Sequence, residues 1–236
     1  MRVGSSVVSA ASVLLCLAAL GYAQEEAPVG VPVPPLGDGP WVIDTAEQHK
    51  TRVSVLARGL ENPWAIAFLP DGAMLVTERS GRLRVVRRGA LDPQPVSGVP
   101  QVRTDGNGGL MDVAVHPDFA DNGLVYLTYT KRHDGGRGAP ALARGRLAGH
   151  ALHDLEDLVT TEPFHSNAGL NGRVAFGRDG KVYMSTGGRI LSPDGELLDT
   201  PQDPGSLRGK VLRLNDDGSA PDDNPFVNEP GHRPEI

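Results

Sequence analysis

Residues 65–77 read AIAFLPDGAMLVT, two short apolar runs joined by Pro-Asp-Gly at residues 70–72. Asp-Gly between two such runs predicts a β-hairpin, because glycine adopts the positive φ that the turn requires. The pattern returns at residues 113–128, with His-Pro-Asp and a short insertion, and at residues 174–186, with Gly-Arg-Asp-Gly. The sequence therefore predicts three related hairpins.

The three hairpins recur at intervals of about 47 and then about 61 residues, a scale that is typical of the blades of a β-propeller. Further strands fit at residues 82–87, 144–147 and 211–214, whereas residues 152–159 read as an apolar-acidic connection. A β-sandwich is the alternative, but it does not explain why the same turn chemistry recurs. We predict an all-β fold in which residues 52–236 form roughly three to four propeller blades.

The composition agrees with a turn-rich, all-β protein. The chain has 30 glycines and 20 prolines but only 5% aromatic residues, which disfavours a helical protein. Its formal net charge is -6, so it lacks the basic balance that binding to nucleic acid requires. We therefore expect no nucleic-acid partner.

The first 23 residues have the features of a secretory signal peptide. Arg2 supplies a basic start, residues 7–20 are apolar or small, and Gly21-Tyr22-Ala23 has small residues at positions −3 and −1 of a cleavage site. The apolar run is shorter than the roughly 20 residues that a membrane-spanning helix needs. We expect cleavage near Ala23, no stable membrane anchor, and a periplasmic or secreted bacterial protein.

The expected mature chain has no cysteine, because Cys16 lies inside the signal, and it therefore has no disulfide framework. Residues 24–51 contain the run APVGVPVPPLGDGP at 27–40, whose proline density is typical of an extended linker. We expect the folded part to begin near Arg52.

Four segments, kept in order, resemble one known family. They are LENPWAIAFLPDG at residues 60–72, GGLMDV at 108–113 followed by HPDF at 116–119, GKVLRLN at 209–215 followed by DDNPF at 222–226, and RPEI at 233–236. The string resembles the glucose/sorbosone dehydrogenase family, which includes soluble quinoprotein aldose sugar dehydrogenases. The resemblance runs from about Leu60 to the last residue.

The resemblance implies a six-bladed propeller that carries pyrroloquinoline quinone (PQQ) over its central axis, with calcium holding the quinone. It also implies a sugar substrate, an electron acceptor, and a histidine that takes the proton of the anomeric hydroxyl while hydride passes to the quinone. Imidazole suits this task because its pKa lies near neutrality. The cofactor performs the redox chemistry, and the protein positions and tunes it.

The position of that histidine differs in this chain. The family has a His-Phe-Gly-Gly-Arg type segment, whereas residues 169–173 read GLNGR, so the resemblance places Gly169 at the position of the base. His165 lies four residues upstream and is the candidate for a displaced base. The alternative is a loop histidine without a catalytic role.

A second departure lies at residues 106–109, which read GNGG where the family often has Gly-Gln-Gly-Gly. Asn107 retains an amide and is the candidate for a hydrogen bond to a sugar hydroxyl, with a shorter reach. The alternative is a glycine-rich turn in which asparagine tolerates positive φ.

In the family, the segments that grip the quinone and bind calcium follow the Pro-Glu-Ile sequence at residues 234–236. The resemblance therefore assigns no cofactor-binding or metal-binding residue to this chain. We expect a truncated or decayed gene product in which the activity is absent or incomplete.

Three functions remain open from the sequence. The first is quinone-dependent oxidation of aldose sugars or related substrates, and the second is a non-catalytic exported propeller for binding or scaffolding. The third is a propeller hydrolase of the lactonase type, which the lack of an acidic metal-ligand pattern disfavours. His150 and His153 read as surface histidines, and residues 215–219 as an exit turn rather than a calcium loop.

Overall fold

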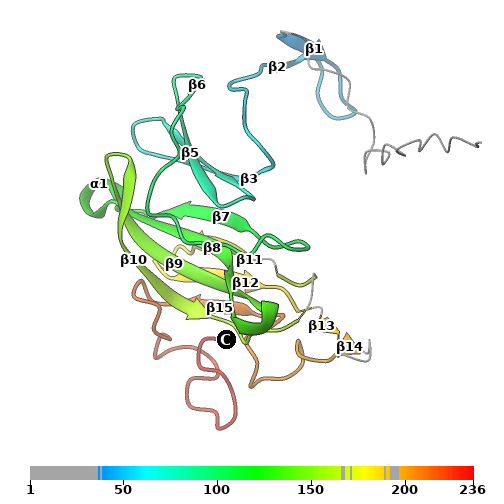
Figure 1. Cartoon of the computed structure of the whole chain (residues 1–236), viewed down its shortest axis with the longest axis vertical. Helices are drawn as coiled ribbons and strands as arrows, with labels where there is room; N and C mark the ends of the chain where they lie inside the picture. Colours follow the sequence, from blue (N-terminus) through cyan, green and yellow to red (C-terminus); the bar gives the residue numbers. More distant parts are fainter. Residues whose placement is uncertain (1–36, 38, 166–167, 171, 189, 192–196) are drawn as a thin grey trace, which may run out of the picture.

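Consecutive antiparallel sheets make up most of the computed structural model (Figure 1). It describes residues 37, 39–165, 168–170, 172–188, 190–191 and 197–236. The expected signal peptide and much of the expected linker lie outside these ranges. No helix within them is long and apolar enough to cross a membrane.

Three sheets follow one another along the chain, each with its strands in sequence order. The first contains β3 (Pro63–Phe68), β4 (Met74–Glu78), β5 (Arg82–Arg87) and β6 (Ala90–Leu91). The second contains β7 (Leu110–Val115), β8 (Leu124–Arg132), β9 (Gly138–Ala148) and β10 (Ala151–Thr160). The third contains β11 (Gly172–Phe176), β12 (Val182–Thr186) and β15 (Val211–Leu214).

The shorter elements connect or precede these sheets. They are β1 (Trp41–Ile43), β2 (Thr51–Val53), α1 (Phe119–Asn122), the 3-10 turn η1 (Asp134–Gly136), β13 (Ile190–Leu191) and β14 (Leu197–Leu198).

The first strand of each sheet lies beside the first strand of the next. β7 contacts both β3 and β11, and Figure 1 shows the three sheets stacked one after another. A row of inner strands, with the later strands of each sheet farther out, is the arrangement of propeller blades. The prediction of an all-β propeller is confirmed, and the described part of the chain supplies three blades.

Two apolar cores lie between the blades. The first joins Leu75 of the first blade to Leu127 of the second, and the second joins Leu142 of the second blade to Met184 of the third. These side chains are fully buried, as is Tyr126 in the second core. Because Tyr126 and Leu127 are neighbours on β8 and point to opposite faces, this strand is covered on both sides. Its nearly continuous apolar sequence follows from that double burial.

A threonine connects the first blade to the second. The register of β3 against β4 shifts between Pro63 and Ala65, which marks a bulge in the inner strand. The Thr77 hydroxyl accepts a hydrogen bond from Ala65 N at 3.0 Å and donates one to Met111 O, on β7, at 2.5 Å. One buried hydroxyl thus provides a hydrogen-bond partner for a backbone N–H of the bulged strand and for a backbone carbonyl of the next inner strand.

The same device connects the second blade to the third. The register of β7 against β8 shifts between Leu110 and Val113. The Thr128 hydroxyl accepts from Asp112 N at 2.9 Å and donates to Gly172 O, on β11, at 2.9 Å. Both threonines are fully buried, so their hydrogen bonds are shielded from water.

One face of β3 carries exposed apolar side chains. Trp64, Ile66 and Phe68 are 39%, 57% and 69% exposed, whereas Ala65 is buried in the first core. Alternation along the strand therefore aims one face of β3 at the second blade and leaves the other face open. Trp64 lies on this open face.

Most of the predicted strands are confirmed. β5 and β15 have the predicted bounds, and the short insertion of the second hairpin forms α1. The interpretation of residues 152–159 as a connection is wrong, because they belong to β10, which pairs with β9. Two register shifts interrupt that pairing, so this outermost strand lacks a regular alternation. β1 lies inside the expected linker and pairs with β2.

We expect Thr128→Val to lower the free energy of unfolding by about 1–3 kcal/mol. Valine keeps the volume of the side chain but leaves Asp112 N and Gly172 O buried without this partner. Thr104→Val, at an exposed loop position, is the control and should change the stability by less than about 0.5 kcal/mol. Urea unfolding measures both variants, and equal stability of the two would show that the buried hydroxyl does not link the blades.

Candidate active site at the inner strands

Segments that precede the inner strands meet at one end of the blades. Asn107 precedes β7 and Leu170 precedes β11, and Leu170 N donates to Asn107 Oδ1 at 3.4 Å. Thr130, near the adjoining end of β8, accepts from Gly109 N at 3.2 Å and donates to Leu170 O at 3.2 Å. The structure therefore brings together two segments that the sequence singled out, around Asn107 and around Gly169.

Arg79 holds the loop that carries Asn107. It lies in the turn between β4 and β5, and its guanidinium donates to Gly108 O at 3.0 Å, to Thr104 O at 2.7 Å and to Gly106 O. The positive φ values of this loop fall on Gly106, at 61°, and on Gly109, and not on Asn107. Sequence analysis missed Arg79, because its acceptors are backbone carbonyls 25 to 29 residues away, which leave no mark in the residue types.

Gly109 allows the same loop to approach the first blade. Its φ is +146°, and a Cβ at this position would lie 2.3 Å from Arg79 O. The next residue, Leu110, donates its N–H to that same oxygen at 3.1 Å. Glycine is therefore required by a backbone contact between the first and second blades.

A buried carboxylate stabilises the turn that carries Arg79. Glu78 is fully buried, accepts from Glu61 N at 2.6 Å and from Arg82 Nε at 2.5 Å, and lies 3.3 Å from the Arg84 guanidinium. Burial opposes its ionisation, but the hydrogen bonds from Glu61, Arg82 and Arg84 outweigh that effect and lower the pKa of Glu78. The carboxylate is thus held ionised inside the first blade.

Gly169 and His165 occupy different surroundings. Gly169 is buried and has a φ of +72°, in the left-handed region that side chains rarely adopt. His165 is exposed, and a Cβ at Gly135 would lie 3.9 Å from its Cε1 atom. The imidazole therefore lies beside η1, in the turn between β8 and β9. The structure pairs Asn107 with the segment of Gly169 and places His165 at this turn.

A second group of side chains lies between the first and third blades. A hollow of about 250 Å³ is bounded by Trp64 of β3, by Gly172 and Arg173 of β11, and by Ser185, Thr186 and Gly187 at the end of β12. The side chain of Arg173 is 68% exposed, and its Nε lies 2.8 Å from the buried Asp112 carboxylate. A guanidinium of this kind suits an anionic, planar group such as a carboxylate.

The described residues contain no group of three or more His, Cys, Asp or Glu side chains that could hold a metal ion. Asn215 N donates to Ser219 O at 2.8 Å, which makes this segment a turn, as predicted. His150 Nε2 contacts Gln94 O at 2.6 Å and does not approach a metal-like cluster.

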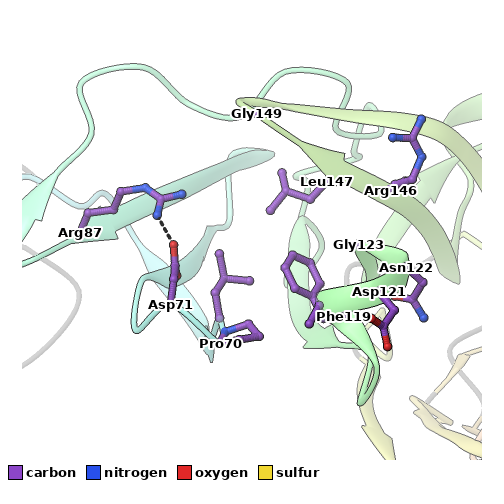
Figure 2. A pocket seen from close by; sticks show the side chains of 12 residues that line it. Pro70, Asp71, Arg87, Phe119, Asp121, Asn122, Gly123, Arg146, Leu147 and Gly149 are labelled. Carbon is purple, nitrogen blue, oxygen red and sulfur yellow. Dashed lines mark hydrogen bonds and ion pairs between the residues drawn. The ribbon is translucent and has the colours of Figure 1, made fainter.

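Another hollow, of about 480 Å³, lies between the first two blades (Figure 2). Pro70, Phe119 and Leu147 point into it, and an ion pair between Asp71 and Arg87, at 2.5 Å, forms one wall. It is built from the turn between β3 and β4, from α1 and from the end of β9. None of the candidate residues named from the sequence lines this hollow, so the candidate active site is the end that carries Asn107.

The sequence of this chain matches the model of a known protein family. The family model described as glucose/sorbosone dehydrogenase matches residues 60–236. The chain belongs to this family. The matched range contains all three blades, and it includes both the Asn107 loop and the segment of Gly169.

Known relatives agree with this assignment. Aldose sugar dehydrogenase YliI of Escherichia coli (strain K12) is 39% identical over 188 residues, covering 78% of this chain and 49% of the relative. Quinoprotein glucose dehydrogenase B of Acinetobacter calcoaceticus is 32% identical over 197 residues, covering 74% of this chain and 41% of the relative. The chain thus spans about half the length of the curated relatives it matches.

A solved structure agrees as well. The PQQ-bound form of aldose sugar dehydrogenase from Streptomyces coelicolor superposes with a TM-score of 0.60 at 30% identity, covering 76% of this chain and 51% of that one. PQQ therefore occurs in the family to which this chain belongs.

We expect the stability of the first blade to depend on the ionisation of Glu78. The pKa of Glu78 is lower in the folded than in the unfolded chain. Ionised Glu78 therefore adds to the free energy of unfolding above the unfolded-state pKa of about 4.3, and this stabilisation is lost as the pH falls through the folded-state pKa. Glu78→Gln should therefore be less stable than the parent at neutral pH, and the difference should shrink in acid.

Urea unfolding at neutral and acidic pH measures this difference, with Glu229→Gln, at an exposed side chain, as the control. A stability difference between the parent and Glu78→Gln that stays constant with pH would contradict the expected linkage.

Proposed function

We propose that the protein is a quinone-dependent aldose sugar dehydrogenase and that this chain carries the sugar side of its site. The contact between Asn107 Oδ1 and Leu170 N is the observation that carries the proposal. It joins the two loops to which the family resemblance assigns the sugar-binding amide and the base. Membership of the family and its PQQ-bound relative support the same chemistry.

The residues of this chain would act in distinct ways. Asn107 would hydrogen-bond a sugar hydroxyl, and Arg79 would limit the movement of its loop. Trp64 and Arg173 border a hollow, and the guanidinium of Arg173 would bind a carboxylate of PQQ there. When bound, the quinone would supply the two-electron acceptor.

Among the described residues, the proposed site lacks a well-placed side chain to accept the proton of the sugar hydroxyl. Gly169 has no side chain that accepts a proton, and His165 lies at the turn between β8 and β9. His165 is our candidate for the proton acceptor, and we expect slow turnover because it has to approach the sugar from that turn.

A second candidate function is a non-catalytic propeller that binds its ligand without oxidising it. The observation in its favour is that Gly169, to which the resemblance assigns the position of the base, is buried with a φ of +72°. The two functions differ in one measurable property, since only the first requires proton removal from the sugar hydroxyl.

We expect Gly169→His to raise the rate of sugar-dependent dye reduction by about 100-fold or more, because it restores a general base. The measurement uses the whole chain with added PQQ and calcium, and a set of aldoses as substrates. His165→Ala should abolish the slow activity of the parent, and His153→Ala, on β10, is its matched control. Circular dichroism checks the fold, since a side chain at φ +72° costs about 1–2 kcal/mol.

Two results decide between the functions. Dye reduction that depends on PQQ and sugar supports the dehydrogenase. A folded Gly169→His variant that binds sugar but never reduces dye supports the non-catalytic propeller and overturns the first proposal.

We further propose that the protein is exported, on the basis of the basic start and apolar run of its first 23 residues. Expression in a bacterial host should give a mature chain that begins at Gln24. Mass spectrometry of the intact protein checks this, with Ala23→Leu as a variant that should slow cleavage. A full-length chain that retains Met1 in the cytoplasm would contradict export.

A further inference from the structure

Asp112 is a buried carboxylate at the contact between two inner strands. It lies within the bulge of β7 and is 4% exposed. Its Oδ1 accepts from Val113 N at 3.0 Å, and its Oδ2 accepts from Val174 N, on β11, at 2.9 Å. Oδ2 also lies 2.8 Å from Arg173 Nε. Backbone donors from two blades therefore hold this carboxylate and compensate part of its charge.

Arg173 is anchored at its stem and open at its tip. Its backbone N–H donates to Ser185 Oγ, on β12, at 3.1 Å, which holds the backbone of Arg173 in place on β11. Its side chain is 68% exposed, and Asp112 is the only partner that its guanidinium has among the described residues. That contact uses Nε. The two terminal amino groups are the donors that form a fork for a planar anion.

A structural ion pair alone accounts poorly for this arrangement. Asp112 already accepts two backbone hydrogen bonds, and the arginine compensates its remaining charge through Nε. A purely structural arginine would gain most by burial with its partner, yet two thirds of this side chain faces solvent. Asp112 instead orients the guanidinium from behind, in the way that a buried carboxylate positions a binding residue.

The hollow in front of Arg173 has the lining of a small-ligand site. Trp64 lines it from the first blade, and Ser185 and Thr186 line it from the third. The bulge at Trp64 and the bulge at Asp112 occupy matching places in β3 and β7. Bulges can re-aim side chains next to binding sites, and these two bulges carry Trp64 and Asp112.

We infer that Arg173, oriented by Asp112, binds the carboxylate group of a ligand in the hollow beside Trp64. A carboxylate accepts two parallel hydrogen bonds from a guanidinium, and the indole offers an apolar face to the body of the ligand. Two sources of this chemistry fit: a carboxylated quinone such as PQQ, and an acidic sugar such as a uronate. The choice of these two sources rests on the proposed function.

The test measures binding rather than turnover. Trp41→Phe leaves Trp64 as the sole tryptophan, so its fluorescence reports occupancy of the hollow in the whole chain. The probes are PQQ, glucuronate and glucose, the last as the neutral counterpart of the uronate. Arg173→Gln should weaken binding of at least one carboxylate probe by about 10- to 100-fold and leave glucose unaffected.

Two further variants separate binding from folding. Arg173→Lys keeps the charge beside Asp112 but lacks the fork, so it should fold like the parent and still lose most of the carboxylate affinity. Arg178→Gln changes an exposed arginine in the turn that follows β11 and should alter neither binding nor stability. If Arg173→Gln unfolds, the lysine variant carries the test.

The outcomes are distinct. Weakened binding of PQQ alone assigns the carboxylate to the quinone, and weakened binding of glucuronate alone assigns it to an acidic sugar. Unchanged affinity for both probes in folded Arg173→Lys overturns the inference. Dye reduction decides the proposed function separately, because carboxylate binding at Arg173 can persist in a chain that oxidises no sugar.

Discussion

The blades of this protein depend on buried threonine hydroxyls that each serve two strands. Thr77 and Thr128 take up an N–H at the bulge of one inner strand and donate to a carbonyl of the next. Without them, each bulge would leave backbone groups unpaired between two apolar cores, which costs about 1–3 kcal/mol for each group. The hydroxyls therefore allow inner strands to be irregular and tightly joined at once. Trp64 and Asp112 lie in these two bulges.

The candidate active site also depends on contacts between neighbouring blades. Arg79 and Gly109 bring a turn of the first blade against the loop of the second, and Thr130 ties that loop to the segment before β11. Buried Glu78 stabilises the turn that carries Arg79 through its contacts with the backbone N–H of Glu61 and the side chains of Arg82 and Arg84. The position of Asn107 is thus a property of three blades acting together, because no single hairpin contains all of its supports.

The family and the chemistry of this chain are separate questions. The chain belongs to the glucose/sorbosone dehydrogenase family, whose relatives include a PQQ-bound enzyme. Fold and ancestry do not supply a base, however, and the resemblance read from the sequence places Gly169 at the position of the base. Its φ of +72° shows that the backbone is adapted to glycine at this point. The exposed guanidinium of Arg173 supports the proposed binding of a carboxylate near the inner strands.

The sequence by itself determined the hairpins, the propeller and the family, because Asp-Gly turns and apolar runs act over a few neighbouring residues. It also singled out Asn107 and Gly169, through a motif that is continuous in the chain. Only the tertiary structure decided that residues 152–159 form a strand, and that Arg79 and Asp112 support the site. Their partners are backbone groups on other blades, and contacts of that kind depend on distance in space rather than on residue type.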